Sequence, residues 1–589
     1  MGLVMILGIS MSHDASVAVT TDDGRVIEAL GEERLTRVKN HWGIPKMAIE
    51  LVSRKYDIKK IVIGSHLNLS RKELEIFESQ LLGNPSNPPG RYSPPFPGFQ
   101  SNYSNTPPKR AMELLISSLL DSRVNSDKLE FVWIHHHDAH TGGALPLYPD
   151  SEFLVFSFDG HGDNVSSQVT RVSTVIGSEE ARQLLRIARK DSLGSLYSAC
   201  TELYNFKPNS HEGKITGLSA TGASSPAIDY LRRQIRVKKG SHSIRIFQSV
   251  PKLIISRFLR SLGVNTLLPR SHIEIMMNAK GRTERYSDLA FATQKVLEEK
   301  LVEIIDFYVS EFNLSKIALT GGLFANVIFN ARIAQMPGVS AVKVFPNMGD
   351  GGLSLGGIWW HLFSHQKLHP SAFPKSMFLA PETELPVDSL IEFQQDPQLT
   401  VTKMDEDLMI PYICEKLSSG KLIGVHKGRM EFGPRALCNR SILIDPRSKA
   451  INRSVNLRLR RTEFMPFAPV VTFDRFERYF KSPQDELFPF YWMTMVCDVR
   501  DAYRDLLAAV THVDGTARPQ IIKEQDDLFM YSILKEFEKR SGVACLVNTS
   551  FNLHEEPINY LISHSISALK QGAVDILVIP GFLIEVKDN

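Results

Sequence analysis

The sequence has little cysteine, almost no net charge and no long apolar run. Its five cysteines are scattered over 589 residues without a Cys-x-x-Cys pair, which is typical of reduced thiols in a cytoplasmic protein. No stretch approaches the roughly 18 apolar residues that a membrane-spanning helix needs. A net charge of +3 argues against a protein that coats nucleic acid, although it allows a local basic site. These absences predict a cytoplasmic protein with no membrane segment and no nucleic-acid partner.

Length and composition indicate an ordinary globular protein with more than one domain. The chain is 43% hydrophobic and 23% charged, and its 589 residues are enough for two or more cores. The opening MGLVMILGIS lacks the basic region and the small-residue cleavage site of a signal peptide, so it predicts a first strand. The runs ASVAVTT and RVIEALGEER, separated by an Asp-Gly turn, predict further strands that form a hairpin.

Two proline-rich segments interrupt the chain. Residues 84–108 hold eight prolines, which exclude a helix or a central strand and leave a lid or a packed surface loop. The stretch HPSAFPKSMFLAPETELP is interpreted as a linker, which predicts domains over residues 1–380 and 381–589. Between the two segments, SDLAFATQKVLEEKLVEIIDFYVSEF predicts the clearest helix of the chain, capped by Ser287.

Side chains from three separate segments are candidate metal ligands. His136 and His140 stand at i and i+4, on one face of a helix, where both imidazoles reach one metal ion. That pair alone is weak evidence, because two ordinary surface or core histidines give the same spacing. Asp159 ends the apolar strand FLVFSFDG, and Asp350 lies in the turn NMGDGG. Imidazoles combined with carboxylates favour Fe(II), Mn(II) or Zn(II) over Mg(II), which prefers oxygen ligands.

The break after the first strand carries His13 and Asp14. Both residues serve equally well as plain turn residues at the end of a hairpin. The functional interpretation is a general base with the carboxylate that orients it, because histidine titrates near neutral pH.

Two strand–glycine–helix units follow the long helix. The first, SKIALTGGLFANVIFNARI, contains Gly321, Gly322 and Asn326, and the second, AVKVFPNMGDGGLSLGG, contains Gly349. Such turns expose backbone N–H groups at a helix N-terminus, which suits a phosphate. Each unit alone is weak evidence, but together with the first hairpin they indicate a duplicated arrangement like that of actin, Hsp70 and hexokinase.

The C-terminal part is rich in arginine. These arginines lie in HKGRMEFGPRALCNRSILIDPR, in NLRLRRTEFMP and in HVDGTARPQ: Arg429, Arg435, Arg440, Arg447, Arg458, Arg460, Arg461 and Arg518. A solvated basic face is the simplest interpretation, but the first group alternates with apolar residues such as Phe432 and Ile442. That alternation favours an inward-facing pocket, where guanidinium groups clamp phosphate through paired hydrogen bonds. The motif NTSFN adds Asn548 and Ser550.

The ordered motifs of the whole chain resemble those of the O-carbamoyltransferases, a family that includes nodulation proteins and antibiotic-tailoring enzymes. The resemblance is carried by GISMSHDAS, GEERLTRVKN, HHDAH, FSFDGHGD, HEGKITGLS, LTGGLFANVIFN, MGDGGLSLGG, GRMEFGPRALCNRSIL, PFAPV and NTSFN. It implies an α/β protein with an N-terminal Kae1-like domain on an actin-like ATPase fold and a C-terminal YrdC-like domain.

The resemblance also implies an activity. The YrdC-like domain would convert carbamoyl phosphate and ATP into carbamoyl-adenylate, and the Kae1-like domain would transfer the carbamoyl group to a hydroxyl of a small-molecule or saccharide acceptor. The implied cofactors are Mg-ATP and an Fe(II), Mn or Zn ion in the N-terminal domain, and a homodimer is compatible with the family.

Residue roles follow motif by motif. Catalytic roles fall to His13, Asp14, Arg435 and Arg518. Nucleotide and carbamoyl phosphate binding falls to Glu212, Lys214, Gly321, Gly322, Asn326, Gly349, Arg429, Arg440, Asn548 and Ser550. Metal binding falls to His136, His140, Asp159 and Asp350.

The sequence departs from the family pattern at two places. In NLRLRRTEFMPFAP, Met465 stands where relatives often have arginine, and Leu459 or a neighbour stands where they have lysine. Arg458, Arg460 and Arg461 are the candidates to replace that charge. Glu555 stands where many relatives have glycine.

Two other functions stay open on the sequence alone. One is an enzyme like the tRNA threonylcarbamoyl transferases, against which the near-neutral net charge counts. The other is a nucleotide switch like actin or Hsp70, which has no need of the His136–His140 pair.

Overall fold

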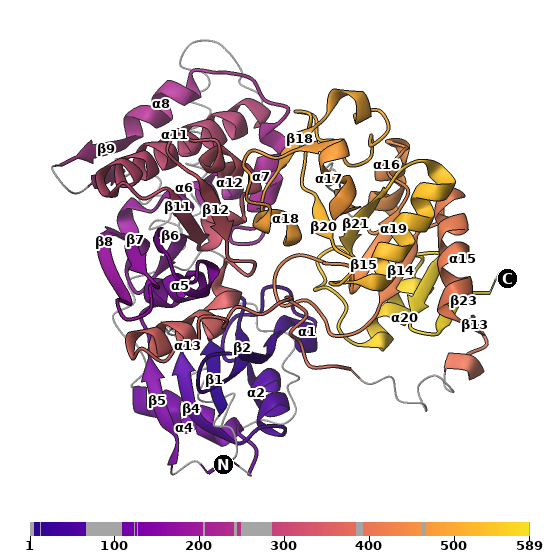
Figure 1. Cartoon of the computed structure of the whole chain (residues 1–589), viewed down its shortest axis with the longest axis horizontal. Coiled ribbons are helices and arrows are strands. Elements are labelled where there is room, and N and C mark those ends of the chain that lie inside the picture. The colour runs from indigo at the N-terminus through magenta and orange to yellow at the C-terminus, as the bar shows by residue number, and fades with distance from the viewer. Residues whose placement is uncertain are drawn as a thin grey trace, which may run out of the picture. The chain divides into compact units, whose positions relative to one another are not determined.

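Figure 1 shows the computed structural model of the chain. The structure describes residues 5–11, 13–65, 109–122, 124–125, 128–203, 206–240, 244–248, 286–383, 393–460 and 467–587. The proline-rich segment 84–108 and the departures at Arg461 and Met465 lie outside these residues. Helices and strands are mixed throughout, which confirms the predicted α/β class.

The chain forms two compact units, and neither is continuous in sequence. The first unit comprises Met1–Val26, Asn40–Val339 and Met348–Phe373. The second unit comprises Ile27–Lys39, Ser340–Asn347 and Pro374–Asn589.

The first unit begins with the predicted strands on either side of His13 and Asp14, and the predicted Asp-Gly hairpin joins the second of these strands to β3 (Val26–Gly31) in the same sheet. Strands β1 (Met5–Ser10) and β2 (Ser16–Thr21) pair antiparallel, and β1 pairs parallel with β4 (Ile58–Ile63) on its other side. The predicted Asp-Gly turn follows β2, where the N–H of Thr21 donates to the carbonyl of Arg25 and Gly24 adopts a φ of 89°. Only glycine reaches that conformation without strain, so the turn is encoded locally.

A second sheet of the first unit repeats this topology. Strand β6 (Glu152–Gly162) pairs antiparallel with β7 (Val165–Ser173) and parallel with β11 (Lys316–Thr320), as β1 does with β2 and β4. The repetition agrees with the duplicated arrangement expected from the sequence, while its identity with the actin-like fold stays a prediction.

The long helix α11 (Tyr286–Phe312) is confirmed, with its apolar stripe in the core of the first unit. Val296, Ile304 and Tyr308 are completely buried along it. The predicted cap is wrong, because the helix begins one residue before Ser287 and takes that serine into its first turn. Helix ends are set by local hydrogen bonding that periodicity does not resolve to one residue.

Two glycine-rich helices cross closely in the first unit. A Cβ on Gly142 of α5 (His136–Ala144) would lie 1.9 Å from the carbonyl oxygen of Gly356 in α13 (Leu353–Ser364), and a Cβ on Gly356 would lie 2.1 Å from that of Ala139. Both positions therefore require glycine. This crossing brings the N-terminal turn of α5 close to the turn that precedes α13.

The remaining elements of the first unit surround these sheets. They are α2 (Lys46–Ser53), α4 (Lys109–Leu119), β5 (Glu130–Trp133), η2 (Leu145–Leu147), β8 (Glu180–Ala188), η3 (Arg189–Asp191), α6 (Leu193–Leu203), α7 (Glu212–Ser219), α8 (Ala227–Gln234), β9 (Ile235–Lys239), β10 (Ile244–Gln248), η4 (Gly322–Ala325), α12 (Val327–Ala334) and η5 (Asp350–Gly352).

The second unit is built on one large mixed sheet. Its strand order is β13 (Leu399–Lys403), β23 (Phe582–Val586), β22 (Ile576–Ile579), β14 (Ile423–His426), β15 (Arg440–Ile444), β21 (Cys545–Ser550), β16 (Ala468–Thr472) and β20 (Gln520–Ile522). Strand β21 runs antiparallel to both β15 and β16, and β16 runs parallel to β20. The starts of β15, β16 and β20 therefore lie at the same edge of the sheet as the end of β21.

Helices and short strands complete the second unit. They are α1 (Glu33–Thr36), α15 (Glu406–Ser418), α16 (Ala450–Arg458), α17 (Phe473–Tyr479), β17 (Phe480–Lys481), α18 (Phe488–Tyr491), β18 (Cys497–Val499), η6 (Asp501–Tyr503), β19 (Thr516–Ala517), α19 (Leu528–Ser541) and α20 (Ile562–Lys570). Strand β3 (Val26–Gly31) pairs with β2, and strand β12 (Ala341–Val344) pairs with β11, each at the edge of its five-stranded sheet. Across the described part of both units, no helix is long and apolar enough to span a membrane.

Candidate functional site

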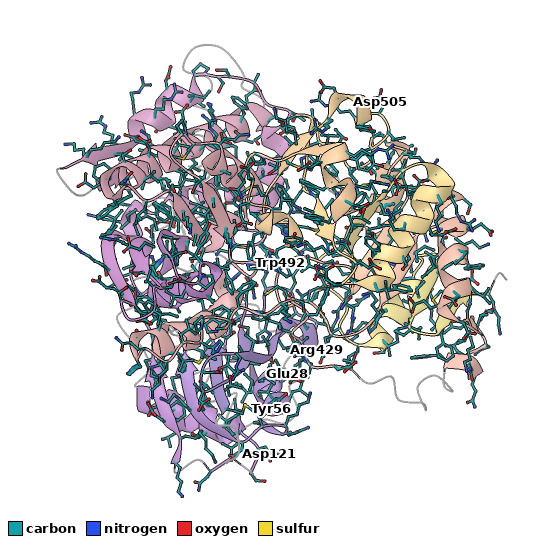
Figure 2. All side chains as sticks on the ribbon, in the orientation of Figure 1. Glu28, Tyr56, Asp121, Arg429, Trp492 and Asp505 are labelled. Atoms are coloured by element: carbon teal, nitrogen blue, oxygen red, sulfur yellow. The ribbon has the colours of Figure 1, made fainter. Side chains whose placement is uncertain are left out.

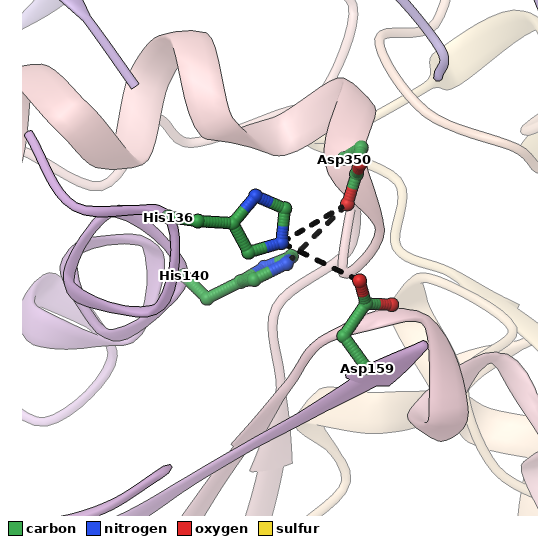
Figure 3. A group of neighbouring side chains, drawn as sticks. All are labelled: His136, His140, Asp159 and Asp350. Carbon is green, nitrogen blue, oxygen red and sulfur yellow. Dashed lines mark hydrogen bonds and ion pairs between the residues drawn. The ribbon is translucent and has the colours of Figure 1, made fainter. Parts of the chain in front are cut away.

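Four side chains that are far apart in the sequence meet in the first unit (Figure 3). His136 and His140 lie one turn apart on α5, Asp159 lies in β6, and Asp350 opens η5. One ligand atom from each residue lies within 4.8 Å of the others. The structure thus brings together the four residues that the sequence predicts as metal ligands, which we call the His–Asp cluster.

Local hydrogen bonds hold the two histidines of this cluster toward the carboxylates. The side chain of His135 caps α5 by accepting from the backbone N–H of His137, and Asp163 accepts from the backbone N–H of His136 at 2.8 Å. His137 points elsewhere, with its ring nitrogens 2.8 Å from the hydroxyl of Ser157 and 3.1 Å from the carbonyl of Val165. His137 therefore lies apart from His136 and His140, the pair that the i and i+4 spacing selects.

The distances within the cluster suit a shared cation better than direct hydrogen bonds. The Nε2 atom of His136 lies 3.4 Å from Asp159 and 3.6 Å from Asp350, and that of His140 lies 3.5 Å from Asp350. In a tetrahedral shell with bonds of ~2.1 Å, neighbouring donor atoms lie about 3.4 Å apart. The Nε2 atom of His140 is buried and has no hydrogen-bond partner among the described residues. The donor set therefore fits a divalent transition metal.

The charges of the cluster are not balanced by protein cations. Burial disfavours a charged His136, but Asp350 and Asp159 outweigh it and raise the pKa of His136 to about 9. In turn, the hydrogen bond from His136 and the charges of the neighbouring histidines hold the pKa of Asp159 well below its usual range, against the effect of burial. A proton on His136 thus supplies positive charge that a metal ion would otherwise bring.

His13 lies near this cluster, in the break between β1 and β2. Its Nδ1 atom is 2.9 Å from the carboxylate of Asp14, which also accepts from the side-chain amide of Asn40 at 2.8 Å. Burial lowers the pKa of His13, but the charges of Asp14, Asp350 and Asp159 prevail and raise it to about 10. The pair therefore has the geometry of an oriented imidazole, whose basicity depends on the charge of the nearby carboxylates.

The first predicted glycine turn is tied directly to the His–Asp cluster. The N–H of Gly322 donates to Asp159 at 2.9 Å, and a Cβ on Gly322 would lie only 2.6 Å from the same carboxylate oxygen. Gly321 has a φ of 96°. At Gly349, a Cβ would meet nothing within 4 Å, so this turn has open space beside its backbone.

The other predicted nucleotide ligands make contacts within the first unit. The side chain of Asn326 caps α12 through its oxygen and donates through its nitrogen to Gln294 at 2.8 Å. Glu212 accepts from the hydroxyl of Ser198 at 2.8 Å, and the ammonium of Lys214 lies 5.1 Å from the ring centre of Phe206. Their roles toward a nucleotide stay predictions.

A cavity of about 290 Å³ lies at the sheet edge of the second unit. Among the predicted residues, Arg435, Arg518, Asn548 and Ser550 line it. The loop that carries Arg435 is shaped by buried Glu431, which accepts from the backbone N–H groups of three residues: Leu437, Asn439 and Arg440. We call this site the guanidinium cavity.

The two guanidinium groups give the cavity a strong positive charge. Burial lowers the pKa of Arg435 to about 10, and burial together with the charge of Arg435 lowers the pKa of Arg518 well below its usual range. The Nε atom of Arg518 has no hydrogen-bond partner among the described residues. An anion in the cavity would relieve this repulsion and accept from both groups.

Arg429 and Arg440 do not line the cavity. Arg429, labelled in Figure 2, donates to the carbonyls of Ala380, Leu379 and Ile27. Arg440 is 1% exposed and donates to the carbonyls of Lys427 and Gly428. Both guanidinium groups therefore tie main-chain segments together. Arg458 also points away, toward the carbonyl of Gly572 and the carboxylate of Asp575.

Sequence reasoning missed Lys39, which lines the cavity although it precedes Arg435 by almost 400 residues. It belongs to the segment 27–39, which Arg37 anchors through hydrogen bonds to the carbonyl of Ile558 and the side chain of Asn559. The motif GEERLTRVKN contains this lysine, but nothing in the motif tells which unit it joins. Asn456, Asn552 and His554 also line the cavity without having been predicted.

The departure at Glu555 lies at the same cavity. Glu555 has a φ of 61°, a conformation that glycine adopts more readily. Its carboxylate lies 3.4 Å from the ring of His554 and is 44% exposed. A carboxylate thus lines the cavity that also contains Lys39, Arg435 and Arg518.

Comparison with known proteins gives matches over both units. Residues 5–358 match a family described as carbamoyltransferase N-terminus, and residues 414–586 match one described as carbamoyltransferase C-terminus. An uncharacterized protein of Methanocaldococcus jannaschii is 27% identical, with 98% of this chain and 99% of that protein covered. Nodulation protein NolNO of Sinorhizobium fredii is 27% identical over 97% of this chain and 79% of its own length. A 3'-hydroxymethylcephem-O-carbamoyltransferase of Amycolatopsis lactamdurans is 30% identical over 41% of this chain and 43% of its own.

Proposed function

The chain belongs to the carbamoyltransferase family, and from this premise we propose that it is an ATP-dependent O-carbamoyltransferase that works in two steps. The observation that carries the proposal is the pair of sites with opposite charge, the His–Asp cluster and the guanidinium cavity. One site suits a divalent cation beside an oriented imidazole, and the other suits a phosphorylated anion.

The first step belongs to the guanidinium cavity. Carbamoyl phosphate, water and ATP give carbamoyl-adenylate, inorganic phosphate and pyrophosphate. Arg435 and Arg518 bind the anionic oxygens of carbamoyl phosphate, and Ser550 and Asn548 contribute neutral polar contacts from the end of β21. Lys39 adds a further positive charge to the lining of the cavity. We leave Arg429 and Arg440 out of the ligand set, because their guanidinium groups hold main-chain carbonyls.

The second step belongs to the first unit. His13 removes the proton of the acceptor hydroxyl, the acceptor oxygen bonds to the carbamoyl carbon, and AMP leaves with the electron pair of the broken bond. Asp14 fixes the ring of His13 through the contact at 2.9 Å. A divalent cation bound by the His–Asp cluster would offset the carboxylates that keep His13 protonated and would act as a Lewis acid toward a carbonyl oxygen.

The acceptor is a hydroxyl of a small molecule or of a saccharide. The cephem relative is named for carbamoylation of a hydroxymethyl group, which supports an alcohol acceptor. The open space beside Gly349 leaves room for the nucleotide. The N–H groups of Gly321 and Gly322 donate to the carbonyl of Met348 and to Asp159, so these two glycines hold their turn beside the His–Asp cluster.

The test is the partial reaction without an acceptor. The purified chain, with Fe(II) and Mg(II) added, should release AMP and pyrophosphate from ATP only when carbamoyl phosphate is present. Absence of both products, with or without candidate alcohols, would exclude the adenylating step. Screening alcohols and saccharides for a mass increase of one carbamoyl group then identifies the acceptor.

A further inference from the structure

Asn548 lines the guanidinium cavity, and hydrogen bonds to its neighbours fix the orientation of its side-chain amide. The Nε2 atom of Gln520 donates to the carbonyl of Leu437 at 3.2 Å, which leaves its Oε1 atom facing Asn548. The Nδ2 atom of Asn548 donates to that oxygen at 2.6 Å and to the carbonyl of Ala436 at 3.1 Å. A main-chain carbonyl only accepts, so both amides can take one orientation only.

This orientation leaves the oxygen of Asn548 without a donor. Asn548 is 2% exposed, lines the cavity, and its Oδ1 atom has no hydrogen-bond partner among the described residues. A buried amide oxygen without a donor is destabilising, and native proteins avoid it unless a ligand or a water supplies the missing hydrogen. The structure therefore holds an acceptor in place for a group that arrives with the ligand.

The cationic side chains of the cavity are hydrogen-bond donors, in contrast to the oxygen of Asn548. Lys39, Arg435 and Arg518 donate hydrogen bonds and attract anionic oxygens. Ionised phosphate has no hydrogen for Asn548, whereas a carbamoyl group has an NH₂ group beside its oxygens. Asn552 adds a second acceptor on the same cavity, because its Nδ2 atom donates to the carbonyls of Leu553 and Glu556 while its oxygen finds no donor in the described chain.

We propose that Gln520 is a positioning residue for donor specificity, which holds the oxygen of Asn548 toward the cavity so that the site selects a carbamoyl NH₂ over a group of equal size that cannot donate a hydrogen bond. This inference rests on the proposed use of carbamoyl phosphate. The inference adds how the site distinguishes carbamoyl phosphate from other acyl phosphates. Gln520 is itself 2% exposed and acts only through Asn548.

Two stable phosphonates test the selection directly. Phosphonoacetamide carries an NH₂ group where acetonylphosphonate carries a methyl group, and both have the same phosphonate. Calorimetric titration of the full-length chain should show phosphonoacetamide binding at least about tenfold more tightly, since a buried acceptor left unpaired costs that much or more. Equal affinities would overturn the proposal and would mean that a water serves Asn548.

A substitution separates positioning from general damage. Gln520→Met removes the hydrogen bonds of Gln520 to Leu437 and Asn548 and its contact with Cys438, so that only the carbonyl of Ala436 and the sulfur of Cys438 still hold the amide of Asn548. The amide is then held less firmly, and the affinity ratio of the two phosphonates should fall below about threefold. Inorganic phosphate should bind the variant within about twofold of the parent chain, because Arg435 and Arg518 are unchanged. The exposed substitution Gln571→Met is the matched control and should keep the full ratio. A Gln520→Met variant that keeps the full ratio would exclude the positioning role.

The outcomes distinguish this inference from the proposed function. If both phosphonates bind equally and Arg518→Ala abolishes their binding, the anion site stands and only the selection is lost. If neither phosphonate nor inorganic phosphate binds, both proposals fail. If Gln520→Met does not fold, the ratio in the parent chain still decides whether the cavity selects an NH₂ group.

Discussion

The His–Asp cluster of the first unit and the guanidinium cavity of the second unit are opposites. The cluster collects hydrogen-bond acceptors, and its carboxylates raise the pKa of His136 to about 9. The cavity collects donors, and burial lowers the pKa of Arg435 to about 10, while burial together with the charge of Arg435 lowers the pKa of Arg518 well below its usual range. In both places the protein leaves buried charge incompletely compensated.

The opposite charges of the two sites indicate which kind of ligand each site binds. An uncompensated buried charge is costly unless it is paired, so each site is best satisfied by a partner of the opposite sign. The cluster calls for a cation, and the cavity calls for an anion. The following experiments try to break this division, beginning with the largest expected effect.

The substitution His13→Asn should remove carbamoyl transfer and leave adenylation intact. Loss of a general base typically costs ~10²–10⁴-fold in rate. Release of AMP from ATP and carbamoyl phosphate, measured without acceptor, should stay within about twofold of the parent chain, because the guanidinium cavity is untouched. The exposed substitution His365→Asn is the control and should affect neither reaction.

The substitution Arg518→Ala should have the complementary effect. Removing a charged hydrogen-bond donor from an anion site costs about 2–5 kcal/mol, so AMP release should fall at least about 30-fold. Arg447→Ala is the matched control, since that arginine pairs with Asp445 at the surface. If Arg518→Ala blocked transfer from a supplied adenylate and spared AMP release, the assignment of steps to sites would be reversed.

The substitution Asp350→Asn tests the cation side. Asp350 lies 3.6 Å from His136 and 3.5 Å from His140, so its loss removes the ligand that both histidines share. We expect the affinity for Fe(II), Mn(II) or Zn(II) to fall by about 100-fold or more. Titration with elemental analysis of the bound metal measures it, and the exposed substitution Asp514→Asn in the second unit serves as control. Unchanged metal content would remove the cluster from the proposal.

The smallest expected effect is on the pH dependence of stability without metal. The folded-state pKa of His136, about 9, lies above its ordinary value of 6.5. Its stabilisation is therefore complete below about pH 6.5 and is lost as the pH rises through 9, by at most about 3 kcal/mol. Thermal unfolding of chelator-treated protein should occur a few degrees lower at pH 9 than at pH 6.5. Saturation with metal should abolish this decrease, because the ion replaces the protons, and a rise with pH would contradict the charge balance described for the cluster.

The sequence predicted best those features whose cause is local. The first hairpin, the helix α11 and the positions of His136 and His140 on one helix follow from turn chemistry and periodicity. Asp159 and Asp350 were found because each ends a strand or opens a glycine turn, which is where functional side chains gather. A local sequence pattern was sufficient for these features, because the residues that form each helix or strand also determine where it ends.

What the sequence could not resolve depends on tertiary contacts. Arg435 and Arg440 stand in one motif, yet the first lines the cavity and the second holds main-chain carbonyls. The difference arises from the fold of the loop around Glu431, which no spacing rule predicts. Lys39 was missed for the same reason, because its partners in the second unit come from the far end of the chain.

The interleaved course of the chain also limits how the protein can be divided. The backbone passes between the two units five times, at residues 26, 39, 339, 347 and 373. A gene fragment that begins at residue 374 would encode the sheet of the second unit but not Arg37 or Lys39. That fragment would lose the anchor at Asn559 and one wall of the guanidinium cavity. A fragment from residue 374 onward therefore does not encode the complete second unit, and a chimaera that uses this unit must also include residues 27–39.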